Sequence, residues 1–250
     1  MTLQPSLEMP AAQDMQTAED RVRELVGALR PVRPIPPLRM GLGAAAATWL
    51  GVVGVLWLVG KLAPRPWNHS DWSDPAFLVV LLGLALIATG STSAALASAV
   101  PGRERASRVG LGIGVLGILL AATSERLWIS PSDLLLSRAD LLACLGCLSH
   151  ATGLGILSAL MTCAFVGFGF LRRPSSSAAL ALVGGVALGA IVVHASCEAT
   201  NPVHQLFSHA LSPGVAAASL TLPTALALRL LAGRVRHAAP TSGRPFPRSN

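Results

Sequence analysis

Residues 41–60 read GLGAAAATWLGVVGVLWLVG, an uninterrupted apolar stretch without a charged side chain. A bilayer has a hydrocarbon core about 30 Å thick, which a helix of about 20 apolar residues can cross. The stretch therefore predicts a membrane-spanning helix. Further apolar runs follow it at intervals along the chain. The expected spans are residues 41–60, 77–100, 109–123, 147–171, 178–195 and 213–232.

The composition agrees with a chain that lies mostly in lipid. Of its 250 residues, 52% are hydrophobic and 12% are charged, and the mean hydropathy is +0.59. Soluble domains carry about 25% charged residues. The predicted fold is therefore an all-α bundle of six transmembrane helices over residues 41–233. Residues 1–40 form a cytoplasmic N-terminal segment, and residues 234–250 form a disordered, basic cytoplasmic tail.

The basic residues predict the orientation of the spans. Short loops on the cytoplasmic side of a membrane are enriched in Lys and Arg. With both termini inside, the inner segments hold fifteen basic residues and the outer segments hold four: Lys61, Arg65, Arg126 and Arg138. We therefore expect a multi-pass protein of the bacterial inner membrane with both termini in the cytoplasm. The same distribution explains the net charge of +7 without direct binding to nucleic acid.

A short amphipathic helix is expected at residues 17–30, before the first span. Apolar side chains recur there at i, i+3, i+4 and i+7, the spacing of one helix face. They are Val22, Leu25, Val26 and Leu29, and Arg30 lies in the last turn. Such a helix can lie on the membrane surface or dock into the groove of a cytoplasmic partner.

Cysteine and histidine are concentrated in two places that the topology puts at the outer face. Asp140, Cys144 and Cys147 follow a helical spacing at the start of the fourth span. His194 and Cys197 share a face at the end of the fifth span, and His204 and His209 are expected on the loop to the sixth. These seven residues are the candidate sensing set.

Two chemistries fit this set. Thiolate, imidazole and carboxylate groups are ligands for zinc or another soft divalent metal ion. In an oxidising compartment the thiols can instead form a disulfide, either between Cys144 and Cys147 or between one of them and Cys197. Cys163, deep in the fourth span, is expected to be a small packing residue.

Several other functions lack support. The chain has no nucleotide-binding loop, no nucleophile elbow and no His-Glu-x-x-His motif, so we do not expect an enzyme. No acidic residue or arginine lies in the middle of a span, which disfavours an ion-driven transporter.

Short motifs along the chain resemble a known family. They are Arg23–Arg33 before the first span, Asp74-Pro75-Ala76-Phe77 opening the second, Val100-Pro101-Gly102-Arg103 closing it, Asp140 with Cys144 before the fourth, and Cys197-Glu198 after the fifth. In their order and six-span frame, over residues 18–233, they are similar to the NrsF-type anti-sigma factors. Those are inner-membrane proteins that restrain an extracytoplasmic-function sigma factor.

The resemblance implies a role for each end of the chain. The N-terminal segment would bind the sigma factor at the membrane surface, and a stress signal would release it. Cys144 and Cys197 would correspond to outer cysteines that sense metal or oxidative stress. On this basis, replacing both with serine should leave sequestration intact and abolish induction.

Two alternatives stay open at the level of the sequence. A membrane thiol-redox enzyme would use Cys144, Cys147 and Cys197, and the N-terminal helix would be incidental to it. A metal transporter would use His204 and His209 as its entrance.

Overall fold

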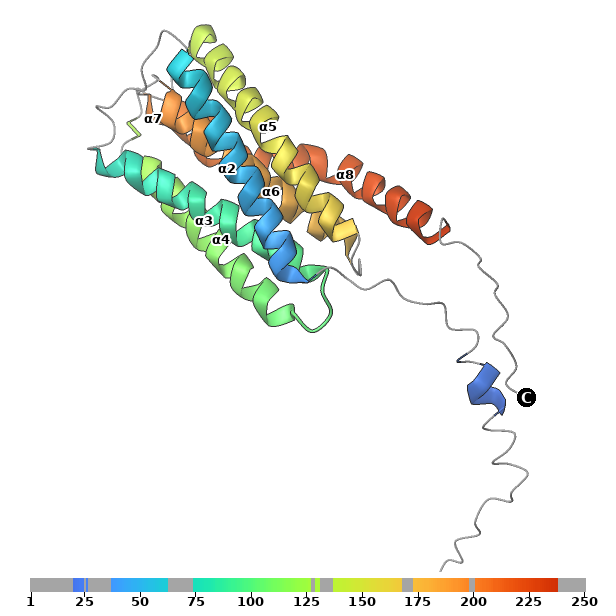
Figure 1. The fold of residues 1–250 in the computed structure, drawn as a ribbon. Helices are drawn as coiled ribbons and strands as arrows, with labels where there is room; N and C mark the ends of the chain where they lie inside the picture. The colour runs from blue at the N-terminus through green and yellow to red at the C-terminus, as the bar shows by residue number, and fades with distance from the viewer. Residues whose placement is uncertain are drawn as a thin grey trace, which may run out of the picture. The chain divides into compact units, whose positions relative to one another are not determined.

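The computed structural model describes residues 20–24, 26, 37–62, 74–126, 129–130, 137–167, 173–197 and 201–237 (Figure 1). The described part of the chain is helical and contains no strand. The chain divides into two units, Met1–Pro34 and Ile35–Asn250. In the first unit only Asp20–Glu24 and Val26 are described, all of them helical. The amphipathic helix at residues 17–30 therefore stays a prediction.

The second unit is a bundle of long helices. Their bounds are α2 Leu38–Leu62, α3 Pro75–Ser98, α4 Glu104–Arg126, α5 Arg138–Gly167, α6 Pro174–Ser196 and α8 Ser212–His237. Two short pieces, α7 Pro202–Gln205 and the π-helical turn η3 Leu206–Ala210, connect α6 to α8.

Five helical segments among the described residues are long and apolar enough to cross a membrane. They are α3, α4 up to Ser124, α5, α6 and the continuous segment Pro202–Leu230. The chain is therefore a multi-pass membrane protein. The first expected span, residues 41–60, lies within helix α2. That α2 is a sixth span stays a prediction.

Capping residues and prolines set the starts of α3, α5 and α6. Asp74 caps α3 by accepting a hydrogen bond from the backbone N–H of Ala76 at 2.9 Å, and Pro75 occupies the first turn. Pro174 likewise begins α6. Helix α5 begins at Arg138, before the expected span 147–171, because Ser137 and Asp140 cap its first turn. Residues 168–172 lie outside the described residues.

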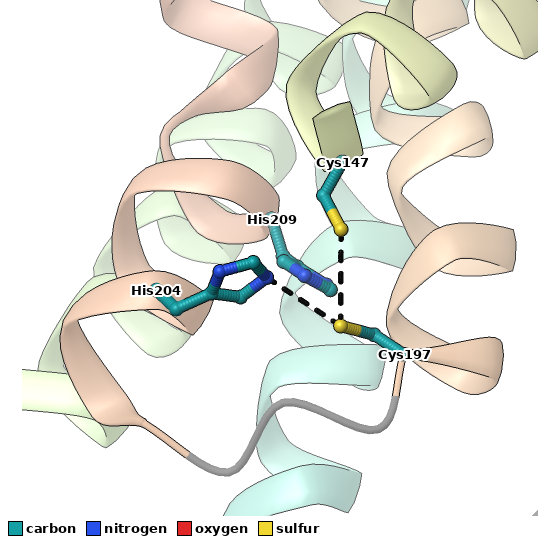
Figure 2. A group of neighbouring side chains, drawn as sticks. All are labelled: Cys147, Cys197, His204 and His209. Carbon is teal, nitrogen blue, oxygen red and sulfur yellow. Dashed lines mark hydrogen bonds between the residues drawn. The ribbon is translucent and has the colours of Figure 1, made fainter. Parts of the chain in front are cut away.

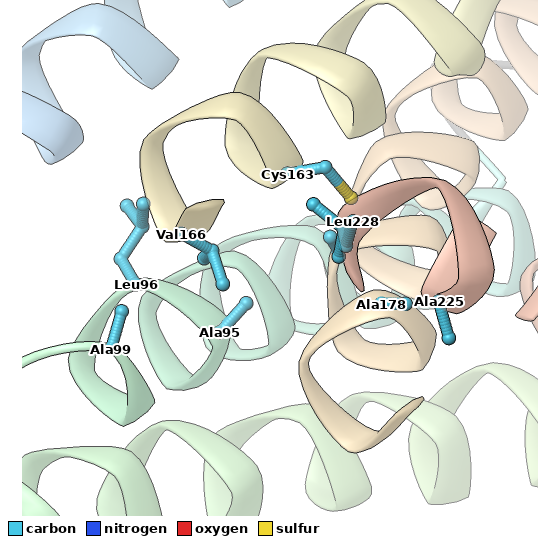
Figure 3. Close-up of a cluster of buried hydrophobic side chains, with 9 residues drawn as sticks. Ala95, Leu96, Ala99, Cys163, Val166, Ala178, Ala225 and Leu228 are labelled. Atoms are coloured by element: carbon cyan, nitrogen blue, oxygen red, sulfur yellow. The ribbon is translucent and has the colours of Figure 1, made fainter. Parts of the chain in front are cut away.

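Helix α6 is the centre of the bundle. In the most apolar 18 residues of α6, 72% of the residues are buried, whereas the corresponding fraction is 22% in α4 and in α5. It packs between α3, α5 and α8 (Figure 1). One buried cluster joins these four helices (Figure 3). Cys163 lies in that cluster, 4% exposed, which confirms the prediction that it is a packing residue.

Small residues allow the helix backbones to touch. A Cβ added at Gly117 of α4 would lie 2.5 Å from the carbonyl oxygen of Gly83 in α3, and one added at Gly90 would lie 2.5 Å from the Gly114 nitrogen. In the α5–α6 pair, Gly189 faces the backbone of Ala151 with similarly little room. Such close approach of backbones at small residues is typical of packed membrane helices.

The two ends of the bundle differ in what they hold. At the end where α2 begins, Leu38 packs on the buried cluster of Figure 3, and a Cβ at Gly41 would meet the ring of Phe165 near the end of α5. At the opposite end α5 begins and α6 finishes. There the ring of Phe77 in α3 stacks on His194 of α6, with centroids 4.6 Å apart. We call this the site end.

The glycine contacts generate a test within one helix. Gly117→Ala in α4 should destabilise the bundle by about 1–3 kcal/mol, because the added methyl meets backbone that has no rotamer to change. Gly112→Ala is the matched control, since nothing lies within 4 Å of its added Cβ and alanine favours helix by about 1 kcal/mol. Thermal unfolding in mild detergent, followed by circular dichroism, measures both. Equal melting temperatures for the two variants would contradict the packing described.

Candidate metal centre

Four side chains converge at the site end of the bundle. Cys147 of α5, Cys197 directly after α6, His204 of α7 and His209 of η3 each offer one ligand atom, and these atoms all lie within 4.8 Å of one another (Figure 2). They come from three separate segments of the chain. The cluster therefore depends on the packing of α5 against α6 and on the path of the connection to α8.

The connection between α6 and α8 sets the positions of both histidines. Asn201 caps α7 by accepting hydrogen bonds from the N–H groups of Val203 and His204, and Pro202 occupies the first turn. The chain then passes through a π-helical turn, a rare conformation that is frequent at functional sites. The expectation that His204 and His209 lie on a loop is wrong, because this Asn-Pro start and the turn after it make the segment helical.

The distances between the ligand atoms suit a tetrahedral ion. Cys147 Sγ lies 3.8 Å from Cys197 Sγ, and Cys197 Sγ lies 3.4 Å from His204 Nε2. Two thiolates bound at about 2.3 Å to tetrahedral zinc stand about 3.8 Å apart, and a thiolate and an imidazole nitrogen stand about 3.6 Å apart. These two distances already match a tetrahedral ion, and the other ligand atoms, which all lie within 4.8 Å of one another, would need to move closer by about 1 Å at most.

The charge of the donor set also fits. Two thiolates balance a divalent cation, and two neutral imidazoles add no charge, so the complex is neutral. A neutral complex is favoured at a partly buried position, where net charge is costly. This set of two cysteines and two histidines matches zinc or another soft divalent ion, as expected from the residue types.

Burial separates the histidines from the cysteines. His204 is 2% exposed and His209 is fully buried, whereas Cys147 and Cys197 are half-buried. The imidazoles are therefore held in place by the surrounding protein, and the thiols are the groups that solvent reaches. An ion or a thiol oxidant would meet the sulfur atoms first.

In each histidine the Nδ1 atom contacts a residue outside the group of four. His204 Nδ1 lies 3.3 Å from Cys144 Sγ, and His209 Nδ1 lies 3.2 Å from His194 Nδ1. The Nε2 atoms are therefore the ones that can bind a metal ion. His209 Nε2 is buried and has no hydrogen-bond partner within the part of the chain that the structure describes. A buried nitrogen without a hydrogen-bond partner, beside two thiols, is explained if this nitrogen is a ligand of a metal ion.

Asp140, the remaining residue of the sensing set, has a different partner. Its carboxylate accepts hydrogen bonds from the Ser137 N–H at 2.9 Å and from the Ser137 hydroxyl at 2.7 Å, while the Asp140 N–H donates to that hydroxyl. This reciprocal arrangement is a capping box at the start of α5. The Ser-x-x-Asp spacing in the sequence was the available signal for it. Glu198 lies outside the described residues.

The geometry also separates the three cysteine pairings. All four cysteines are free thiols, and among them the pair in contact is Cys147 with Cys197. Cys144 contacts His204 instead. Of the disulfides considered, oxidation would therefore join Cys147 to Cys197 with the least movement.

Two supporting residues were not singled out as part of the site from the sequence. Phe77 stacks on His194, and its carbonyl oxygen lies 3.4 Å from His194 Nε2. Asn201 sets the direction of α7. An aromatic residue just inside a capped helix start, and an Asn-Pro pair between two histidine-containing segments, were the signals present.

Comparison of the chain with known protein families, with curated proteins and with solved structures found no match.

From this geometry we expect metal binding that requires Cys147 and depends only weakly on Cys144. The detergent-solubilised protein should bind Co²⁺, a spectroscopic substitute for zinc, with thiolate-to-metal charge-transfer absorption. Cys147→Ser should abolish tight binding, because it removes a ligand. Cys144→Ser should cost about 10–100-fold at most, the usual effect of a group that supports a ligand.

Asp140→Asn is the second control, because its carboxylate caps a helix. It should keep the affinity and the spectrum of the unmodified protein. Equal loss of binding in all three variants would show that the four-residue assignment is wrong.

Proposed function

We propose that this chain is a multi-pass anti-sigma factor of the bacterial inner membrane, with six spans and both termini in the cytoplasm. Its N-terminal segment holds an extracytoplasmic-function sigma factor. The Cys/His site at the far end of the bundle binds a soft divalent metal ion or undergoes thiol oxidation, and either event weakens that hold.

The observation that carries the proposal is the separation of two features along one bundle. The chain enters α2 at Leu38, beside the buried cluster of Figure 3. The Cys/His site lies where α5 begins and α6 finishes, at the opposite end. A reactive site at one end of the bundle, with the chain entering the bundle at the other end, suits a transmembrane sensor. The order of the short motifs along the chain supports the same reading.

The N-terminal segment has the character of a docking element. Val22 and Val26 are helical and 57% and 60% exposed, and their spacing places them on one helix face. Leu25, Leu29 and Arg30, the other expected contacts, lie outside the described residues. The apolar face of the proposed helix would bury these side chains in a groove of the sigma factor.

Helix α6 is the element that would connect the two ends. It carries His194 and is followed directly by Cys197 at the site end, and its first turns pack into the buried cluster near Leu38. Ser98 of α3 and Ser177 of α6 lie 3.0 Å apart there. A shift of α6 at the site would therefore change the packing beside the start of α2. A coupling of about 1–3 kcal/mol changes partner affinity about 5–150-fold.

Co-purification tests the partner. The full chain with a C-terminal tag, extracted from its native membrane, should carry a sigma factor, and a version lacking residues 1–34 should not. This deletion stops short of α2 and so leaves the bundle whole. Val22→Glu with Val26→Glu should also lose the partner, because both positions are exposed and apolar.

Glu24→Ala, on the other side of the same helix, is the matched control and should retain the partner. If no sigma factor accompanies the full chain in unstressed cells, the anti-sigma proposal is wrong, and the thiol-redox alternative becomes the better one.

Induction of a sigma-dependent reporter tests the sensor and separates its two chemistries. Cys147→Ser with Cys197→Ser should keep the reporter silent under both Zn²⁺ and the thiol oxidant diamide. His204→Asn should abolish the response to Zn²⁺ and retain the response to diamide, because it removes a metal ligand and leaves the thiol pair in place. Cys163→Ala, in the core cluster, is the control. Normal induction in the double variant would refute the sensing half of the proposal.

A further inference from the structure

The three buried histidines at the site end form a chain of contacts that leads away from the ligands. His209 touches His194 through their Nδ1 atoms, 3.2 Å apart, and His194 Nε2 lies 3.4 Å from the carbonyl oxygen of Phe77. His194 is 3% exposed, and its ring stacks on Phe77 with the two planes 15° apart. It does not belong to the group of four ligand atoms.

The direction of these hydrogen bonds follows from what each atom can do. A carbonyl oxygen only accepts, so His194 Nε2 carries a proton and donates it to Phe77. In the neutral ring the other nitrogen, Nδ1, is then an acceptor. His209 Nδ1 must therefore carry a proton and donate to it. The lone pair of a neutral His209 is left on Nε2, the buried atom without a partner among the described residues.

We infer that His194 is a positioning residue of the metal site: by accepting the Nδ1 proton of His209, it fixes the tautomer and the ring orientation that present His209 Nε2 to a soft divalent cation. This inference rests on the metal-binding part of the proposed function. Metal-bound histidines commonly donate their second ring N–H to a neighbouring acceptor, and losing that acceptor costs about 10–100-fold in metal affinity.

The motif Asp74-Pro75-Ala76-Phe77 helps to hold His194 in these contacts. Asp74 and Pro75 fix the start of α3, so the Phe77 ring and carbonyl are held where His194 needs them. The orientation of His209 is thus set by the first turn of α3. A change in the contact between α3 and α6 would alter the ligand set without touching a ligand.

Two substitutions at His194 separate positioning from packing. His194→Asn keeps a hydrogen-bond acceptor near the place of Nδ1 and loses the stacked ring. His194→Phe keeps a ring of similar shape against Phe77 and loses the acceptor. Co²⁺ titration of the full-length protein in detergent measures affinity, and the visible spectrum reports the ligand set. Ser196→Ala is the control, because its hydroxyl bonds the backbone of its own helix.

If His194 positions His209, the His194→Asn variant should retain most of the Co²⁺ affinity and the His194→Phe variant should lose about 10–100-fold. The shape of the absorption bands should be unchanged in both variants. The reverse order would assign His194 a packing role and overturn the inference. A changed spectrum in both variants would make His194 a ligand and overturn it as well. If the unmodified protein fails to bind Co²⁺, the metal half of the proposed function fails first, before any variant is compared.

A second measurement does not depend on the folding of any variant. Nuclear magnetic resonance of the unmodified, metal-free protein, labelled with ¹⁵N in its histidines, reports which ring nitrogen carries the proton. His209 should be the Nδ1–H tautomer. Observation of the Nε2–H tautomer would overturn the inference.

Discussion

Backbone contact around α6 is the constraint on which the rest of the structure depends. Lipid is as apolar as leucine, so burying leucine between spans gains little, and membrane helices associate instead through close packing of small residues. In this chain Gly155, Gly185 and Gly189 let α5 and α6 meet backbone to backbone, and Gly184 faces Thr92 of α3. Such contacts leave few side chains that could rearrange. The position of α6 relative to its neighbours is therefore closely defined.

This packing explains which cysteines meet. Gly189 of α6 approaches the backbone nitrogen of Gly155 in α5, and the two helices run in opposite directions. Cys147 precedes Gly155 by eight residues (155 − 147), and Cys197 follows Gly189 by eight (197 − 189). Equal offsets from one contact place the two thiols at the same level of the bundle. Cys144 lies nearly one turn further on, and it meets His204 instead.

The same contact shows where inference from the sequence stops. Apolar length located the helices, because it depends on local chemistry. Helical periodicity put Cys144 and Cys147 on one face, but it could not choose between them, since the choice depends on which glycine of α5 meets which glycine of α6. The helical path through His204 and His209 was missed for another reason. Its Asn-Pro start follows directly on a polar stretch, which made a loop the simpler prediction.

The free energy that a metal site can supply is much larger than the free energy that the proposed signalling requires. A structural zinc site contributes an apparent free energy of about 10–16 kcal/mol in small peptides, whereas a change of about 100-fold in partner affinity needs about 3 kcal/mol. Only a minor part of the binding free energy would therefore have to differ between two packings of α6. In the proposed mechanism, a small displacement of α6, which has glycine contacts with α3 and α5, would supply that difference. No span would need to unfold or cross the membrane, which is consistent with a bundle whose Cys/His site lies at one end and whose helices meet at small residues.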